Sequence, residues 1–262
     1  MIQIDDLIKD VQSRFDARNI AVNRVGIRRL RHPFSFENQN VVGYFDMLVN
    51  LPENIKGTHM SRFVEILNEQ PTVLSIAAIP LWLEKIVSRL QADNGFLQVQ
   101  FPYFLKKAAP ISNTSGWMDY DINLRGIFEK GCAKTYITVV VPVTSLCPCS
   151  KEIADYGAHN QRSHVTVTVC VLPGFSLEDL IKCVESTATC ELYSILKRAD
   201  EKAVTERAYD NPKFVEDMVR DIATLLKTLP TIKGYKVSIE NFESIHNHSA
   251  YAEIDNLSAK TI

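Results

Sequence analysis

The chain has 262 residues, of which 46% are hydrophobic and 23% charged, and its formal net charge is −2. This length allows one large or two modest domains with a substantial core. The near-neutral balance excludes the strongly basic surface of proteins that wrap duplex nucleic acid or lie on anionic membranes. No segment approaches the roughly 18 apolar residues of a membrane span, and the stretch 1–19 lacks the apolar run of a signal peptide. We therefore expect a cytoplasmic protein with neither a nucleic-acid nor a membrane partner.

The six cysteines do not predict a disulfide framework, because the cytosol keeps thiols reduced. Four of them lie in strand, helix or turn patterns and are expected to be ordinary packing or surface residues: Cys132, Cys170, Cys183 and Cys190. Cys147 and Cys149 differ, since they share a polar loop with histidines.

The first half of the chain predicts two strands, two helices and two strands. Alternating apolar residues indicate the strands, and apolar stripes at helical spacing indicate the helices. In chain order the predicted elements are strands at 25–34 and 41–51, helices at 61–68 and 80–90, and strands at 97–103 and 118–124. The order is ββααββ.

The second half predicts the same order. The strands are expected at 136–143, 165–171, 235–239 and 250–254, and the helices at 177–196 and 212–226. Ser176 with Asp179 is typical of a helix start, as is Asn211 followed by Pro212. The charged stretch 197–212 between the helices predicts a solvated loop. The repeat predicts an α+β protein of two modules, 1–128 and 129–262, each an antiparallel sheet with a helix pair on one face.

The polar loop predicted at 144–164 has the composition of a metal site. Cys147, Cys149, His159 and His164 lie within it, and thiolate and imidazole ligands suit zinc and similar divalent ions. A Cys-Pro-Cys spacing is too tight for the usual structural knuckle, which favours a catalytic site with an open position for water. A structural metal and no metal at all are the alternatives.

A second polar loop precedes the last predicted strand. Glu243, His246 and His248 lie in it, and two histidines two residues apart point the same way in an extended segment. Imidazoles titrate near neutral pH, so this pair suits proton transfer. The alternative is a hairpin loop whose histidines simply face water.

Two glutamates have no evident role from the residues alone. Glu201 lies in the charged stretch, where a solvated side chain is the ordinary expectation. Glu216 lies in the first turns of a predicted helix, and an ion pair with Arg220 four residues later would account for it.

Four blocks in the same order resemble type IB GTP cyclohydrolase I. They are VPVTSLCPCSKEIADYGAHNQRSHVTV at 141–167, KGTHMSRF at 56–63, DEKAVTERAYDNPKFVEDMVRD at 200–221 and ENFESIHNHSAYA at 240–252. The resemblance implies the tunnelling fold, whose unit is ββααββ, with two units fused in one chain. It also implies that copies associate into a multimeric barrel, expected to be a homotetramer, with sites between subunits.

The resemblance further implies an activity and its residues. The reaction is the metal-dependent hydrolysis of GTP to 7,8-dihydroneopterin triphosphate and formate, the first step of tetrahydrofolate biosynthesis. The implied metal ligands are Cys147, His159 and Glu201, and the implied catalytic residues are Cys147, Cys149, Glu243, His246 and His248. The metal would be Zn²⁺, Mn²⁺ or Fe²⁺. Glu216 becomes the purine anchor, because a carboxylate can accept both the ring N–H and the exocyclic amine of guanine.

The triphosphate also needs cations, and the resembling blocks contain several candidates: Arg62, Lys151, Arg162, Arg198 and Lys202. Three other functions are compatible with parts of the pattern. A deazaguanine nitrile reductase of the same fold would use a cysteine nucleophile and NADPH, and an archaeal-type cyclohydrolase would form a cyclic phosphate. A non-catalytic zinc or purine-binding protein would only use the metal to fix a loop.

Overall fold

The computed structural model describes residues 10–69 and 72–257, which form two compact units. Unit 1 runs through Phe101 and also contains Leu124–Thr135; unit 2 contains Pro102–Asn123 and the chain from Tyr136 onward. Residues 1–9, part of the stretch in which the sequence indicates no signal peptide, lie outside the described residues. None of the described helices is long and apolar enough to span a bilayer.

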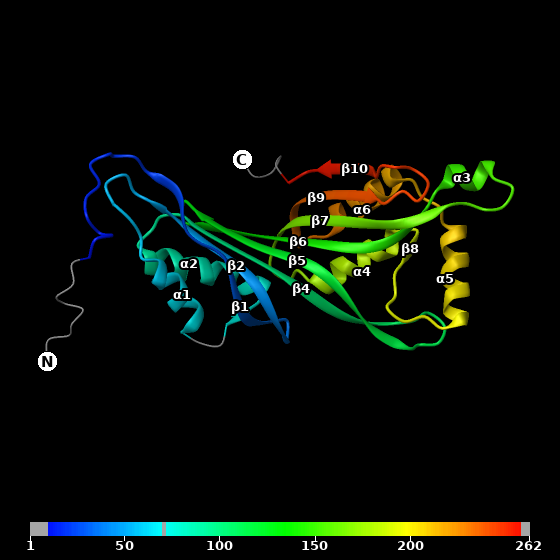
Figure 1. Cartoon of the computed structure of the whole chain (residues 1–262), viewed down its shortest axis with the longest axis horizontal. Coiled ribbons are helices and arrows are strands. Elements are labelled where there is room, and N and C mark those ends of the chain that lie inside the picture. The colour runs from blue at the N-terminus through cyan, green and yellow to red at the C-terminus, as the bar shows by residue number, and fades with distance from the viewer. Residues whose placement is uncertain (1–9, 70–71, 258–262) are drawn as a thin grey trace. The chain divides into compact units, whose positions relative to one another are not determined.

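Unit 1 combines antiparallel strands with a helix pair (Figure 1). Its elements are β1 (Val22–Phe36), β2 (Gln39–Leu51), α1 (Met60–Asn68), β3 (Val73–Leu74), the 3₁₀ turn η2 (Ile76–Ala78), α2 (Ile79–Leu90) and parts of β4 (Gly95–Ala108) and β5 (Ser115–Glu129). The strand order is β5-β4-β2-β1-β3. Glu37 and Asn38 link β1 to β2 with φ of 44° and 65°, a backbone that suits a tight hairpin.

The core of unit 1 follows from the alternation in its strands. Phe45 and Met47 of β2 are fully buried, as are Phe63 of α1 and Leu83 of α2. The predicted strands and both predicted helices of this half are therefore confirmed, and Pro80 lies in the first turn of α2 as expected.

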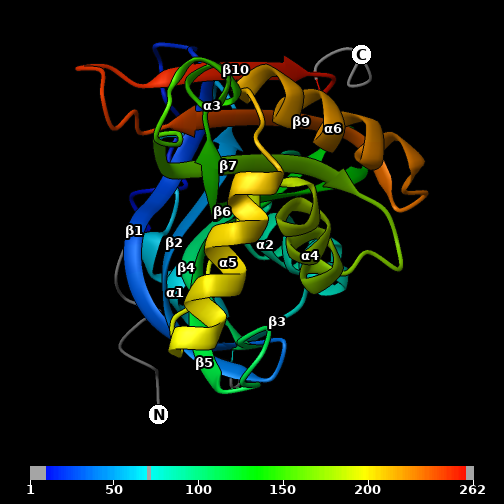
Figure 2. The same cartoon turned by 90° about the vertical axis from the view of Figure 1, so that its right-hand side faces the viewer.

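Unit 2 repeats the layered arrangement with additional short elements. It contains β6 (Cys132–Leu146, from Tyr136), α3 (Pro148–Ile153), β7 (Asn160–Val171), α4 (Leu177–Thr187), β8 (Cys190–Glu191), α5 (Arg198–Asp210), α6 (Val215–Thr228), β9 (Ile232–Asn241) and β10 (Ala250–Asp255). The strand order is β10-β9-β7-β6-β5, with β8 on β6. Figures 1 and 2 show α4 and α6 together on one face of these strands. The protein is thus a mixed α+β protein, as predicted, with a large, mostly antiparallel sheet.

The predicted helix 177–196 begins where expected but is too long. Ser176 caps α4, its Oγ accepting a hydrogen bond from the Asp179 N–H at 3.2 Å. The helix ends at Thr187, because Cys190 and Glu191 pair with β6 instead. Leu192 and Leu196 continue the apolar spacing of α4, but this strand pairing overrides their helical periodicity.

The prediction of a solvated loop at 197–212 is wrong, because residues 198–210 form α5. This helix is polar around its circumference, so no apolar stripe marks it. The predicted helix start at Asn211 and Pro212 is also wrong. Asn211 ends α5 and its Nδ2 donates to the carbonyls of Ala188 and Thr189, while α6 begins at Val215.

Candidate active site

The connection between β6 and β7 is closed by hydrogen bonds at its two ends. Cys147 caps α3, its Sγ accepting from the Ser150 N–H at 3.4 Å, and the Cys147 N–H donates to the His159 carbonyl at 3.2 Å. Ser150 Oγ donates to the Cys147 carbonyl at 3.1 Å and accepts from the His159 N–H at 3.3 Å. The two ends of the loop are therefore hydrogen-bonded to each other, which makes Cys147 and His159 neighbours along the backbone.

The ring of His159 is oriented by a glutamine. His159 Nδ1 lies 3.0 Å from Gln161 Oε1 and 3.2 Å from Ser244 Oγ. Gln161 Nε2 donates to Ser145 Oγ at 2.8 Å and to Glu243 Oε1 at 3.4 Å, which fixes the amide with its oxygen toward the imidazole. Nδ1 therefore carries the proton, and Nε2 is left with the lone pair that a metal would use.

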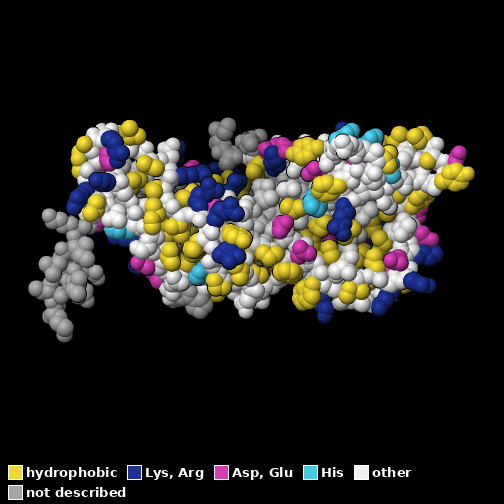
Figure 3. All heavy atoms as spheres, in the orientation of Figure 1, with side chains coloured by type: hydrophobic (Ala, Val, Ile, Leu, Met, Phe, Trp, Pro, Cys, Tyr) yellow, Lys and Arg dark blue, Asp and Glu magenta, His cyan; other side chains and the backbone are white. Residues whose placement is uncertain are grey.

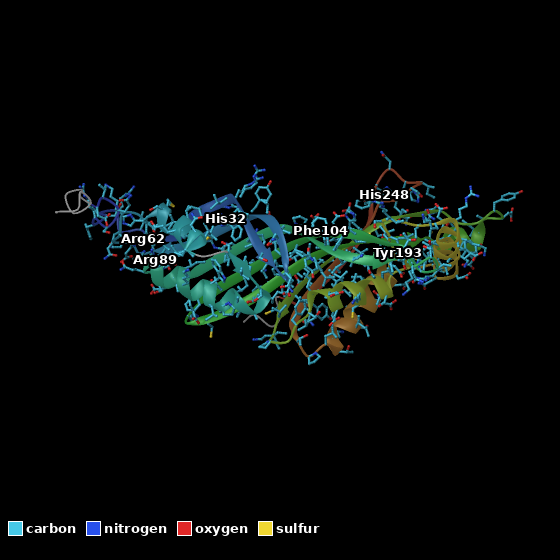
Figure 4. All side chains as sticks on the ribbon, turned by 90° about the horizontal axis from the view of Figure 1, so that it is seen from below. His32, Arg62, Arg89, Phe104, Tyr193 and His248 are labelled. Carbon is cyan, nitrogen blue, oxygen red and sulfur yellow. The ribbon has the colours of Figure 1, made fainter. Side chains whose placement is uncertain are left out.

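The loop between β9 and β10 meets this network through Glu243 and Ser244. Farther along it, the rings of His246 and His248 lie face to face, with centroids 5.2 Å apart and planes at 19°. The prediction that these two histidines share one side is confirmed. Both are exposed, and Figure 4 shows His248 on a loop that projects from unit 2.

The structure does not bring Glu201 into a metal-binding group. Within residues 10–69 and 72–257, no three His, Cys, Asp or Glu side chains are arranged to hold a metal ion. Glu201 lies exposed in the first turn of α5, and Cys149 lies exposed in α3. Cys147 and His159 are adjacent, whereas the third ligand and the catalytic assignments stay predictions.

Glu216 is exposed in the first turn of α6 and does not form the predicted alternative, an ion pair with Arg220. Arg220 instead approaches Asp217, with Nη1 and Oδ1 3.9 Å apart. An interaction with Arg220 therefore does not account for Glu216, and its carboxylate remains accessible to a ligand.

Asp200 fixes the start of α5 and was not predicted. It is fully buried and accepts hydrogen bonds from the Ile111 and Ser112 N–H groups, both at 2.8 Å, from Ser112 Oγ at 2.7 Å and from the Lys197 N–H at 2.8 Å. Burial favours the neutral carboxyl, but these hydrogen bonds outweigh it and hold the pKa of Asp200 below its usual range. Asp200 thereby holds the turn that carries Glu201. The available signal was an acid three residues after a helix start.

Comparison with known proteins decides the family. The family model described as "Type I GTP cyclohydrolase folE2" matches residues 8–252. The chain belongs to the type I GTP cyclohydrolase FolE2 family.

The FolE2 relatives match along nearly the whole chain. "GTP cyclohydrolase FolE2 2" of Dechloromonas aromatica is 53% identical, covering 95% of this chain and 94% of the relative. "GTP cyclohydrolase FolE2" of Azoarcus sp. is 54% identical over the same shares. Among solved structures, uricase from Arthrobacter globiformis aligns with a TM-score of 0.48 and 10% identity over 88% of this chain and 92% of that chain. That score is too low to bear on the fold.

Two of the cations predicted for the triphosphate of a FolE2 substrate are engaged elsewhere. Lys202 pairs with Glu206 at 2.6 Å, and Lys151 donates to the Tyr209 carbonyl while its Nζ lies 4.1 Å from the centre of that ring. Arg162 lines a cavity of about 360 Å³ in unit 2. Arg198 begins α5, and Arg62 lies half-buried in α1.

The residues that orient His159 escaped the sequence prediction. Gln161, Ser145 and Ser244 are neutral polar residues, a class that is common in any loop and carries no metal-binding signal. Ser145 is fully buried, and a buried hydroxyl needs a hydrogen-bond partner, which Gln161 provides. The closeness of Ser244 to Glu243 in the sequence was the one available hint.

The remaining cysteines behave as ordinary thiols. None of the six cysteines forms a disulfide, and Cys170 and Cys190 are buried. Burial raises the pKa of the Cys190 thiol to about 11, so it stays protonated near neutral pH and is a poor ligand or nucleophile. The packing role predicted for it is consistent with this environment.

Proposed function

We propose that the protein hydrolyses GTP to 7,8-dihydroneopterin triphosphate and formate, the first step of tetrahydrofolate biosynthesis, in the cytoplasm. Family membership supports GTP as the substrate. The observation that carries the mechanism is the network in which Gln161 joins His159, next to Cys147, to Glu243. A loop with a purely structural role would not need a glutamine that links an imidazole to a carboxylate of another loop.

The donor chemistry fits a divalent metal. Cys147 Sγ and His159 Nε2 would be two ligands and Glu201 the third, a mixed set that Zn²⁺, Mn²⁺ or Fe²⁺ accepts. When bound, the metal would act as a Lewis acid that activates water toward C8 of guanine. Gln161 supports this role, since it keeps the proton on Nδ1 and leaves Nε2 available.

The other predicted residues would act on the substrate. Glu216 would anchor guanine by accepting two N–H groups in parallel. Its carboxylate is exposed and has no ion-pair partner among residues 10–69 and 72–257, which favours this role over a surface ion pair. His246 and His248 would move protons to and from the purine and ribose, and Cys149 and Glu243 would assist beside them. Ring opening and closure both require such transfers.

We also propose that the fold is the tunnelling fold, with tandem ββααββ modules at 1–128 and 129–262, and that copies assemble into a barrel, expected to be a homotetramer. The element order supports the repeat: β1, β2, α1, α2, β4 and β5 are followed by β6, β7, α4, α6, β9 and β10. Assembly would also explain why the described part of one chain lacks a complete metal-binding group.

The test is to incubate the metal-reconstituted protein with GTP and separate the products by chromatography. We expect formate and a pterin triphosphate that becomes fluorescent after oxidation. A product with the mass of a cyclic phosphate would indicate the archaeal-type reaction instead. NADPH consumption with a deazaguanine nitrile and no metal would indicate the reductase, and GTP or zinc binding without turnover would indicate a binding protein.

A further inference from the structure

A cavity of about 360 Å³ lies within unit 2, and none of the proposed metal, guanine or proton-transfer residues lines it. Its charged and aromatic lining comes from two strands: Trp117, Asp119 and Asp121 of β5, and Arg162 and His164 of β7. Exposed and buried side chains alternate along these parts of both strands, so the lining residues of each strand share one exposed face. Figure 3 shows acidic, basic and histidine side chains close together where Figure 1 draws β5 and β7.

The opposite charges that line this cavity do not pair with one another. Asp119, Asp121 and Arg162 form no ion pair within residues 10–69 and 72–257. Strand β6 lies between β5 and β7, so the acidic and basic side chains start two strand spacings apart, about 10 Å. Pro142 of β6 pairs with His164 and gives the cavity an apolar surface between them. The cavity therefore separates two carboxylates from one guanidinium and leaves room for a ligand that contacts both.

Trp117 adds an aromatic surface beside the two carboxylates. The residue is 63% exposed, so its ring has apolar area that a ligand could cover. Of the aromatic side chains, tryptophan attracts a cation most strongly. Successive side chains on one face of a strand are about 7 Å apart, so Trp117, Asp119 and Asp121 form a row along β5. Such a row can hold two cationic groups of one ligand.

We propose that this β5–β7 cavity (Trp117, Asp119, Asp121, Arg162 and His164) binds a basic amino acid of the lysine type. Arg162 binds the carboxylate with two parallel hydrogen bonds. Asp119 and Asp121 bind the two ammonium groups, and Trp117 covers the methylene chain. One anion and two cations of the ligand then match one guanidinium and two carboxylates of the cavity. Its volume is near the lower end of the range for small-molecule sites, about 300–1,000 Å³, and the inference does not depend on the proposed function.

Other classes of ligand match the cavity less well. A triphosphate is repelled by the two carboxylates, so Arg162 is better placed for a zwitterion than for the phosphates of GTP. A divalent cation needs clustered donors, and in the described part of the chain no three His, Cys, Asp or Glu side chains are arranged to hold one. An apolar ligand would take the three charged groups out of water without pairing them.

The first experiment uses three probes on the metal-loaded, full-length wild type, with binding measured by calorimetry. L-Lysine carries all three charged groups, L-norleucine lacks the terminal ammonium, and cadaverine has both ammonium groups but no carboxylate. We expect L-lysine to bind about tenfold more tightly than either of the others, since each charge-assisted contact accounts for roughly a factor of ten. This comparison needs no substitution, so it decides the matter even where a variant folds poorly.

The second experiment assigns each ligand charge to its partner in the cavity. Arg162→Gln should weaken L-lysine about tenfold without weakening cadaverine, because only the carboxylate loses its partner. Asp119→Asn/Asp121→Asn should weaken both probes, by about 10²-fold for L-lysine. Asp155→Asn/Asp210→Asn removes the same charge from other exposed positions of unit 2 and should change neither affinity. All these positions are exposed, so the melting temperatures should stay close to that of the wild type.

Three outcomes would overturn the proposal. A wild type without saturable L-lysine binding would show that the cavity is not such a site. Equal affinities of the wild type for L-lysine and cadaverine would exclude Arg162 as a carboxylate partner and an amino acid as the ligand. Unchanged L-lysine affinity in Asp119→Asn/Asp121→Asn would place the binding elsewhere on the protein.

Discussion

The two repeats of the chain use the same elements but differ in their connections. In the first, β1 and β2 are joined by the tight turn at Glu37 and Asn38, and β4 and β5 by residues 109–114. In the second, the corresponding connections, 147–159 and 242–249, are longer. The stretch between α4 and α6 contains β8 and the helix α5, whereas the stretch between α1 and α2 contains β3 and the 3₁₀ turn η2.

Every predicted metal and catalytic residue lies in these longer connections: Cys147, Cys149, His159, Glu201, Glu243, His246 and His248. In the strands of both repeats, alternate side chains are buried in the core and are not accessible to a ligand. A rigid sheet can therefore be kept while its loops acquire reactive groups, which is how folds usually gain sites.

The largest effect is expected at Cys147, in the longer β6–β7 connection of the second repeat. Cys147→Ala removes the softest proposed ligand, and we expect turnover to fall by more than the roughly 100-fold that loss of an outer-shell partner costs. Metal retained after gel filtration should fall as well. Cys190→Ala is the matched control, because that thiol is buried and stays protonated near neutral pH, so its loss should leave metal content unchanged. If Cys147→Ala kept full activity and its full metal content, the proposed catalytic role of the β6–β7 connection would be wrong.

The β9–β10 connection is tested by its histidines. His246→Ala and His248→Ala should each slow kcat by roughly 10²- to 10⁴-fold, the range for loss of a general acid or base, with metal still bound. Single-turnover measurements with GTP would give the rate. If neither variant changes kcat, the stacked pair simply faces water.

Glu216 tests whether the purine is bound outside these connections. Glu216→Gln replaces one acceptor with a donor facing the guanine amine, so KM for GTP should rise on the order of 10²-fold. Melting temperature and metal content should barely change. Arg220→Ala, which removes a cation that approaches Asp217 rather than Glu216, should leave KM nearly unchanged. Equal, small effects from the two variants would place the purine elsewhere.

Gln161 tests the link between the two loops. Gln161→Leu removes the acceptor of the His159 Nδ1 proton, and metal affinity should fall by about 10- to 100-fold in a chelator competition. Gln161→Glu/Glu243→Gln exchanges carboxylate and amide while keeping an oxygen toward the imidazole. It should recover most of that affinity. Equal losses in both variants would mean that Gln161 only fills space.

The smallest effect is expected for a substitution of Asp200, which should change how the stability of the fold depends on pH. Because its pKa is lowered in the folded protein, the ionised carboxylate stabilises the fold at pH values above its unfolded pKa of about 4. This stability is lost as pH falls through the lower folded pKa. Asp200→Asn should therefore melt several degrees lower at pH 7, and the difference should shrink below about pH 4. A constant difference across pH would exclude the charge as the cause.

The sequence by itself determined the α+β class, the strands and most helices, because alternation and apolar stripes report burial directly. Phe45, Met47 and Val167 follow this rule and are all buried. The residue types Cys, His and Glu also pointed to metal and proton-transfer chemistry. These features depend only on local spacing and side-chain class.

Three features were determined only by the tertiary structure. They are the formation of α5, the early end of α4 and the hydrogen-bond partners of His159. Helix α5 has no apolar stripe and is held by Asp200, whose partners Ile111 and Ser112 are distant in sequence. Cys190 and Glu191 leave the helical pattern because β6 offers unpaired backbone groups. Gln161 joins His159 to Glu243 across 82 positions of sequence. Each of these depends on which distant hydrogen-bonding group the fold brings near, and periodicity along the chain carries no record of that.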